Sequence, residues 1–272
     1  MRRSDLKTNS EKPPMQMKIP YQQLYRLGLL FTPFFYLRWL GRKTFIYQIN
    51  RAIKMKLRVN TYDKVAVYQV WRRKEYEDDQ FFIRPNDVVI DIGAHIGAFS
   101  IWAASQARSG TIYAFEPNAD NFSLLEENIK LNHLPNVRAF KLAVADKSGK
   151  ALLYNSKSQN MTHSLFESAF THSIKIDTIS LAEILEVNGI EEVDYLKIDA
   201  EGAEYPILLT LPAALLSRFK KIFIEFHDYL DHGYTYRDLE HFLSANGFRV
   251  ELERTAFKRD VLKMSLLRAI RI

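Results

Sequence analysis

The stretch Val88-Val89-Ile90-Asp91-Ile92-Gly93-Ala94-His95-Ile96-Gly97-Ala98-Phe99-Ser100 decides the fold of this chain. Its first part is an apolar, β-branched run, which is typical of a parallel strand covered on both faces. Asp91 interrupts the run near the expected end of the strand. Gly93 can adopt backbone angles that other residues avoid, and Gly97 has no side chain to hold a ligand away from the first helical turn. Because ligands of open α/β sheets bind beyond the carboxyl ends of strands, this loop is predicted to bind a nucleotide-like molecule.

Strands and helices are expected to alternate along the rest of the chain. Residues 151–176 are less regular, which indicates an insertion with extra strands or a mobile loop. The alternation predicts an α/β, Rossmann-like fold with a mostly parallel sheet and helices on both faces. Expected strands are 111–115, 137–145, 194–198 and 221–226, with a closing pair at 248–252 and 262–270, and expected helices are 118–132, 180–187 and 236–245.

Basic residues are concentrated in the N-terminal quarter of the chain. The formal net charge is +6, but residues 1–75 carry 17 Lys and Arg against 4 Asp and Glu, and the remainder carries 21 against 28. We therefore expect a basic, aromatic, helical extension over residues 1–75, followed by a ligand-binding domain over residues 76–272. The chain has no cysteine, which excludes disulfides and thiolate chemistry. This composition fits a reducing compartment, so a cytoplasmic location is expected.

The N-terminal extension has two open interpretations. Residues 1–18 lack the apolar core of a secretory signal, and the longest uncharged run that follows, residues 27–37, has 11 residues where a membrane-spanning helix needs about 20. A membrane span is therefore rejected. The cations and aromatic side chains of residues 19–58 suit peripheral contact with an anionic membrane, at its inner face. In the other interpretation, helices in this segment pack on the domain and their cations are solvated.

An acidic residue on the second expected strand narrows the choice of ligand. Glu116 lies 19 residues after Gly97, close to the separation at which an acid accepts hydrogen bonds from ribose hydroxyls. The loop lacks the middle glycine of the dinucleotide fingerprint, and Asp91 adds negative charge where a diphosphate would lie. An adenosine ligand with a positive centre and no phosphates, such as S-adenosylmethionine, is favoured. The alternative function is that of a nicotinamide-dependent oxidoreductase. A third hypothesis is a binding module directed to a membrane or to nucleic acid. Nucleic acid is disfavoured because the domain itself is net negative.

Four motifs, in this order, resemble those of FkbM-type methyltransferases: Asp91–Ser100, Phe115–Pro117, Leu196–Glu204 and Ile224–His227. The resemblance covers residues 78–247. It implies a class I fold with a seven-stranded sheet and an S-adenosylmethionine-dependent methyltransferase domain over residues 76–272. It also implies O-methylation of a hydroxyl on a sugar, glycan or secondary metabolite.

The resemblance implies a role for each polar residue at the strand ends. Glu116 would hold the ribose, and the backbone near Val144 would approach the adenine. Asp199, Glu201 and His227 would face the transferred methyl group and the acceptor. The expected cofactor contacts are Asp91, Gly93, Gly97, Glu116, Val144 and Asp199.

A general base would accelerate attack by a hydroxyl about 10² to 10⁴-fold. His227 is the natural base at neutral pH, and Asp199 or Glu201 are alternatives if crowding raises a pKa. A purely structural interpretation is that the two acids cap the following helix. Asp199, Glu225 and His227 would also suit a divalent metal, but their spacing is not diagnostic and no metal is expected.

Overall fold

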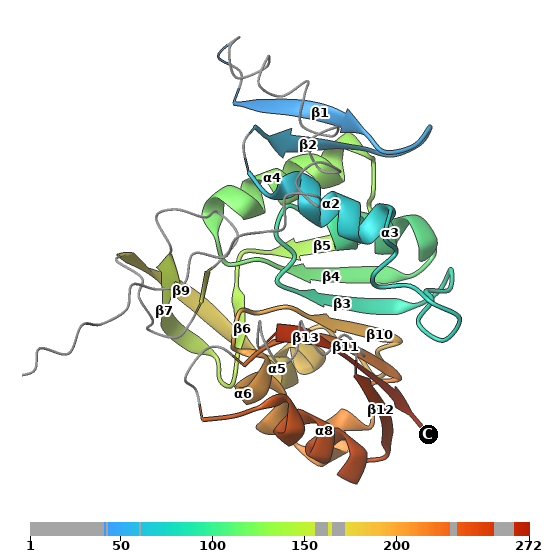
Figure 1. The fold of residues 1–272 in the computed structure, drawn as a ribbon, viewed down its shortest axis with the longest axis vertical. Helices are drawn as coiled ribbons and strands as arrows, with labels where there is room; N and C mark the ends of the chain where they lie inside the picture. Colours follow the sequence, from blue (N-terminus) through green and yellow to red (C-terminus); the bar gives the residue numbers. More distant parts are fainter. Residues whose placement is uncertain are drawn as a thin grey trace, which may run out of the picture. The chain divides into compact units, whose positions relative to one another are not determined.

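A seven-stranded sheet forms the centre of the structure, a computed structural model that describes residues 41, 43–59, 61–155, 163–164, 172–228, 233–252 and 264–272 (Figure 1). The strand order is β12-β13-β11-β10-β3-β4-β5. The strands are β3 (Val88–Ile92), β4 (Thr111–Phe115), β5 (Val137–Phe140), β10 (Tyr195–Ile198), β11 (Lys221–His227), β12 (Phe248–Leu252) and β13 (Met264–Arg271). All neighbouring pairs from β11 to β5 are parallel, whereas β13 is antiparallel to both of its neighbours. The carboxyl ends of β3, β4, β10 and β11 therefore meet at one edge, as predicted.

Helices cover both faces of this sheet (Figure 1). Val89 and Ile90 are both fully buried but belong to different cores, one on each face. This explains the continuous apolar run in the sequence, because a strand covered on both faces needs no polar alternation. One face carries α2 (Asp63–Trp71), α3 (Ala98–Gln106) and α4 (Ala119–Leu131), and the other carries α5 (Leu181–Val187), α6 (Glu204–Leu209), α7 (Ala213–Leu216) and α8 (Tyr236–Ala245).

A second sheet confirms the predicted insertion. Its order is β6-β9-β7-β8, with strands β6 (Ala143–Ala145), β7 (Gly149–Asn155), β8 (His163–Ser164) and β9 (His172–Ser180). The single strand expected over residues 137–145 is wrong. Its first part, β5, pairs with β4, and its last part, β6, pairs with β9 of the second sheet. The chain changes sheet at Lys141 and Leu142.

A hairpin of β1 (Thr44–Gln48) and β2 (Lys54–Arg58) lies where helices were expected. Met55 and Leu57 are fully buried in the core that contains α3. The compact unit therefore begins at Thr44, earlier than the boundary expected after residue 75. Most of residues 19–43 lies outside the described residues. Among the helices that are described, none has the length and apolarity to cross a membrane.

Candidate active site

Backbone hydrogen bonds join the loops that follow β3, β4 and β10. The N–H groups of Gly93 and Ala94 donate to the carbonyl of Phe115 at 3.0 and 2.9 Å, and the N–H of Asp199 donates to the carbonyl of Ile92 at 3.1 Å. A Cβ on Gly93 would lie 1.8 Å from the carbonyl oxygen of Asp199. Glycine is therefore required by the close approach of the neighbouring loop, as well as by its φ of 76°.

Gly97 precedes α3 with a φ of 90°. A Cβ at this position would lie 2.6 Å from Cδ1 of Leu125 in α4. The structure adds a second reason for this glycine, which is the close approach of Leu125. The absence of a side chain at Gly97 thus lets the loop approach α4 closely, and a contact of Gly97 with the cofactor stays a prediction.

Lys197, which the sequence reasoning did not single out, lies beneath the glycine loop. Its Nζ donates to the carbonyl of Gly93 at 2.9 Å and lies 3.1 Å from the carboxylate of Asp91 and 3.8 Å from that of Asp199. Burial, the largest effect, lowers the pKa of Lys197, but the two carboxylates more than offset it and raise this pKa above its usual value. Asp91 is fully buried and also accepts a hydrogen bond from the hydroxyl of Ser100. Its charge thus neutralises Lys197 inside the protein and is not presented at the surface of the loop.

Glu116 lies at the end of β4 and is 5% exposed. Its Oε2 accepts from the backbone N–H of His95 and its Oε1 from that of Asn118, both at 2.8 Å. Burial raises the pKa of Glu116 to about 7, although these hydrogen bonds oppose the rise. Oε2 has a second acceptor position, whereas Oε1 also lies 3.4 Å from Nδ2 of Asn121. A buried carboxyl beside the glycine loop therefore fits the donor hydroxyls of a ribose.

Glu204, also missed by the sequence reasoning, organises the turn after β10. It is fully buried, and its two oxygens accept from the N–H groups of Ala200 and Gly202, both at 2.8 Å. Its Oε1 also lies 3.0 Å from Nδ1 of His227. Glu201 occupies the same turn with a φ of 50°, and its Oε2 lies 3.7 Å from Nε2 of His227. The imidazole is thus held between two carboxylates of one turn.

Acidic groups dominate the electrostatics around His227, which is buried. Burial, the largest effect, lowers the pKa of His227, but Glu204, Glu201 and Glu225 together raise it well above its usual value. Burial and the charge of Asp199 raise the pKa of Glu225 to about 8. These acids therefore favour the protonated form of the His227 imidazole.

Asp199, Glu201 and His227, the three expected catalytic residues, come together at this edge of the sheet. One ligand atom from each lies within 4.8 Å of the others. These atoms could hold a divalent cation. The set considered from the sequence was Asp199, Glu225 and His227, and the structure groups Glu201 instead of Glu225 with the other two. That no metal is used stays a prediction.

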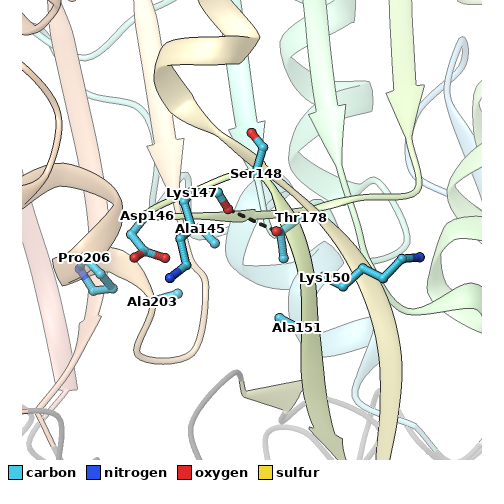
Figure 2. Close-up of a pocket in the computed structure, with 9 residues that line it drawn as sticks. All are labelled: Ala145, Asp146, Lys147, Ser148, Lys150, Ala151, Thr178, Ala203 and Pro206. Atoms are coloured by element: carbon cyan, nitrogen blue, oxygen red, sulfur yellow. Dashed lines mark hydrogen bonds between the residues drawn. The ribbon is translucent and has the colours of Figure 1, made fainter.

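A cavity of about 340 Å³ lies between the second sheet and the start of α6 (Figure 2). In the wall of the cavity, the hydroxyl of Thr178 in β9 donates to the carbonyl of Lys147 at 3.0 Å. Ala203 lines the cavity and directly precedes Glu204, so the cavity adjoins the turn that holds His227. Val144, the expected adenine contact, lies in the same sheet, where it is buried and pairs with Ile179. Other lining residues are Asp146, Lys150 and Pro206.

The strand order, the antiparallel β13 and the acidic carboxyl edge together define a class I methyltransferase. A model of the methyltransferase FkbM domain matches residues 91–250, more than half of the chain. The chain belongs to the FkbM methyltransferase family, whose methyl donor is S-adenosylmethionine. This membership overturns the nicotinamide alternative.

Similar proteins support the same assignment. Methyltransferase 1 of Beauveria bassiana is 25% identical over 242 residues, which cover 82% of this chain and 93% of that protein. The hexuronic acid methyltransferase AglP of Haloferax volcanii is 29% identical, covering 61% of this chain and 70% of that protein. The 31-O-demethyl-FK506 methyltransferase FkbM of Streptomyces tacrolimicus is 27% identical, covering 54% and 67% respectively.

A solved structure shows the same fold. The crystal structure of methyltransferase FkbM from Methylobacillus flagellatus superposes with a TM-score of 0.50 at 14% identity. The match covers 75% of this chain, but this chain spans only about half, 47%, of the length of that one. At this identity the likeness concerns the fold alone.

Proposed function

We propose that this protein O-methylates a hydroxyl group of a sugar, a glycan or a secondary metabolite, with His227 as general base. The observation that carries the proposal is the setting of His227, whose Nδ1 lies 3.0 Å from Glu204 and whose Nε2 lies 3.7 Å from Glu201. The names of two relatives agree with this substrate class, because one acts on a hexuronic acid and another on an O-demethylated metabolite.

The cofactor site is proposed at the loops after β3 and β4. Glu116 would accept hydrogen bonds from the ribose hydroxyls, and the backbone near Val144 would approach the adenine. Gly93 and Gly97 would shape the loop beside the methionine end of the cofactor. Asp91 would act indirectly, because it pairs with Lys197, whose Nζ donates to the carbonyl of Gly93. When bound there, S-adenosylmethionine supplies an electrophilic methyl group.

The remaining residues deal with the acceptor and its proton. Methylation forms a C–O bond, breaks the methyl–sulfur bond and releases the hydroxyl proton, which His227 would accept at Nε2 in its neutral form. Glu204 would stabilise the resulting imidazolium through the Nδ1–H. Asp199 and Glu201 would flank the acceptor and orient it, while the single proton of the reacting hydroxyl is directed to His227. Because the surrounding carboxylates raise the pKa of His227, the rate should rise with pH beyond neutrality.

The cavity between the second sheet and α6 is our candidate for the acceptor site. It adjoins the turn of Glu204 through Ala203, and Pro206 of α6 also lines it. Its remaining lining residues come from the inserted sheet and the connection between β6 and β7, outside the seven-stranded core. The acceptor would therefore be selected by the insertion, whereas the cofactor is bound by the sheet edge.

Calorimetry and a methyl-transfer assay test the proposal together. The protein should bind S-adenosylhomocysteine, and with trideuteromethyl-labelled S-adenosylmethionine it should add one labelled methyl to a hydroxyl compound in metabolite or glycan extracts, measured by mass spectrometry. His227→Gln should keep the binding and lose about 10² to 10⁴-fold in transfer rate. His241→Gln, at an exposed position of α8, is the matched control and should change neither.

Two results would contradict the proposal. A folded protein that does not bind S-adenosylhomocysteine would remove the cofactor site, and a His227→Gln variant with full activity would remove the base. Treatment with EDTA should leave the rate unchanged. A rate that is lost to EDTA and restored by Mg²⁺ would instead make Asp199, Glu201 and His227 metal ligands.

A further inference from the structure

Two asparagine side chains, Asn128 of α4 and Asn132 directly after the end of this helix, hold the free edge of β2. Oδ1 of Asn132 accepts from the N–H of Lys54 at 3.0 Å, and its Nδ2 donates to the carbonyl of Lys54 at 2.7 Å. Asn128 makes the same pair of bonds with Lys56, at 2.6 and 3.1 Å. The two amides thus take the place of a neighbouring strand, which an edge strand otherwise lacks. The hairpin is fixed to the helix that packs beside the glycine loop.

Arg58 is the last residue of β2, and its side chain contacts residues that lie next to the proposed cofactor site. Its guanidinium donates to Asp63 through Nε at 3.0 Å and through Nη2 at 2.8 Å. The same Nη2 donates to Oδ1 of Asn121 at 2.9 Å and lies 3.2 Å from Nε2 of His95. Asp63 is fully buried, and the side chain of Arg58 is 16% exposed. The arginine is therefore built into the structure and is not a solvated surface cation.

Both Asn121 and His95 also contact Glu116. The backbone N–H of His95 donates to Oε2 of Glu116 at 2.8 Å, and Nδ2 of Asn121 lies 3.4 Å from Oε1, a long hydrogen bond. Arginine has donors and no acceptor. Asn121 must therefore turn its oxygen toward Arg58, which leaves its NH₂ group for the carboxylate of Glu116.

We infer that Arg58 is a positioning residue of the cofactor site, because it orients Asn121 and the His95 loop around Glu116. The inference rests on the proposed role of Glu116 in binding the ribose. It makes the N-terminal hairpin a part of the methyl-donor site, which the FkbM domain match, beginning at residue 91, does not include. Arg58, one of the basic residues of this hairpin, therefore makes its contacts inside the protein.

Calorimetry of the full chain with S-adenosylhomocysteine tests the inference. Arg58→Met should weaken binding about tenfold, the equivalent of one charge-assisted hydrogen bond. Lys56→Met is the matched control, since Lys56 lies on the same strand and its Nζ pairs with Glu127 of the same helix at 2.6 Å, without contact to Glu116. It should bind like the wild type. Arg58→Lys should recover only part of the affinity, because lysine cannot reproduce the guanidinium fork.

A double-mutant cycle separates positioning from general destabilisation. In a Glu116→Gln background, Arg58→Met should change the affinity by no more than about twofold. An equal loss in both backgrounds, or an Arg58→Met variant that binds like the wild type, would overturn the inference. If Arg58→Met does not fold, Asn121→Ala replaces it in the cycle with the same expectation, because it leaves the Arg58–Asp63 pair intact. A wild-type protein that does not bind S-adenosylhomocysteine would refute the proposed function and this inference with it, whereas a wild type that binds beside an Arg58→Met variant that binds equally well would overturn the inference alone.

Discussion

The carboxyl of Glu116 is expected to lose a proton when the cofactor binds. Burial raises the pKa of Glu116 to about 7, so the ligand-free protein holds this proton about half of the time at neutral pH. Ribose hydroxyls donate hydrogen bonds and therefore stabilise the ionised form. By linkage, the affinity for S-adenosylhomocysteine should rise as the pH increases from about 6 to 8 and then level off. Calorimetry in buffers with different ionisation enthalpies measures the released proton directly.

Two variants serve as controls for the Glu116 prediction. Glu116→Gln should abolish the pH dependence, because the amide has no proton to release. Glu225→Gln should keep it, although the pKa of Glu225 is also raised, to about 8. Proton uptake by the wild type on binding, or the same pH dependence in Glu116→Gln, would contradict the role that we assign to Glu116.

At the scale of elements, Lys197 joins β10 to the loop after β3. Lys197→Met would leave the fully buried Asp91 without its cation, which costs about 3 to 5 kcal/mol. The free energy of unfolding measured with urea should fall by this amount. The further substitution Asp91→Asn should restore a large part, because the remaining amide carries no charge. If the double variant is no more stable than the single one, the ion pair is not the source of the loss.

Elements with local signals could be predicted from the sequence. Strands β3, β4 and β12 and helix α8 lie where their apolar patterns and end signals place them. The side chain of Asn118 caps α4 as expected, accepting from the N–H groups of Asp120 and Asn121. The hairpin was missed because Lys54-Met55-Lys56-Leu57-Arg58 was interpreted by its charge, although its alternation also fits a half-buried strand.

The candidate site could be located from the sequence, but its internal contacts could not. Glu116, Asp199, Glu201 and His227 lie at one edge because the order of parallel strands requires it. Glu204 and Lys197 were overlooked because the contacts of Glu204 with His227 and of Lys197 with Asp91 join residues far apart in sequence. A lysine inside the buried strand Tyr195–Ile198 was nevertheless a usable signal, since a buried cation requires a partner.

For the whole molecule, the compact unit that begins at Thr44 predicts where the chain tolerates truncation. A protein of residues 44–272 should keep the melting temperature and S-adenosylhomocysteine affinity of the full chain. Deletion of residues 1–58 should cause unfolding, because it removes the buried side chains of Met55 and Leu57. Each is worth about 2 to 5 kcal/mol, against a total stability of about 5 to 15 kcal/mol. A folded protein of residues 59–272 would contradict this prediction.

The same truncation tests the proposed membrane contact. Residues 1–43 carry 9 Lys and Arg against 2 Asp and Glu, whereas Lys56 and Arg58 of the hairpin are paired with acids of the domain. Each cation near an anionic surface contributes about 1 kcal/mol, and salt screens this contribution. The full chain should therefore sediment with anionic vesicles at low salt and be released at high salt, while residues 44–272 should stay in the supernatant. Equal sedimentation of both proteins would show that the segment before Thr44 is not the membrane-binding part.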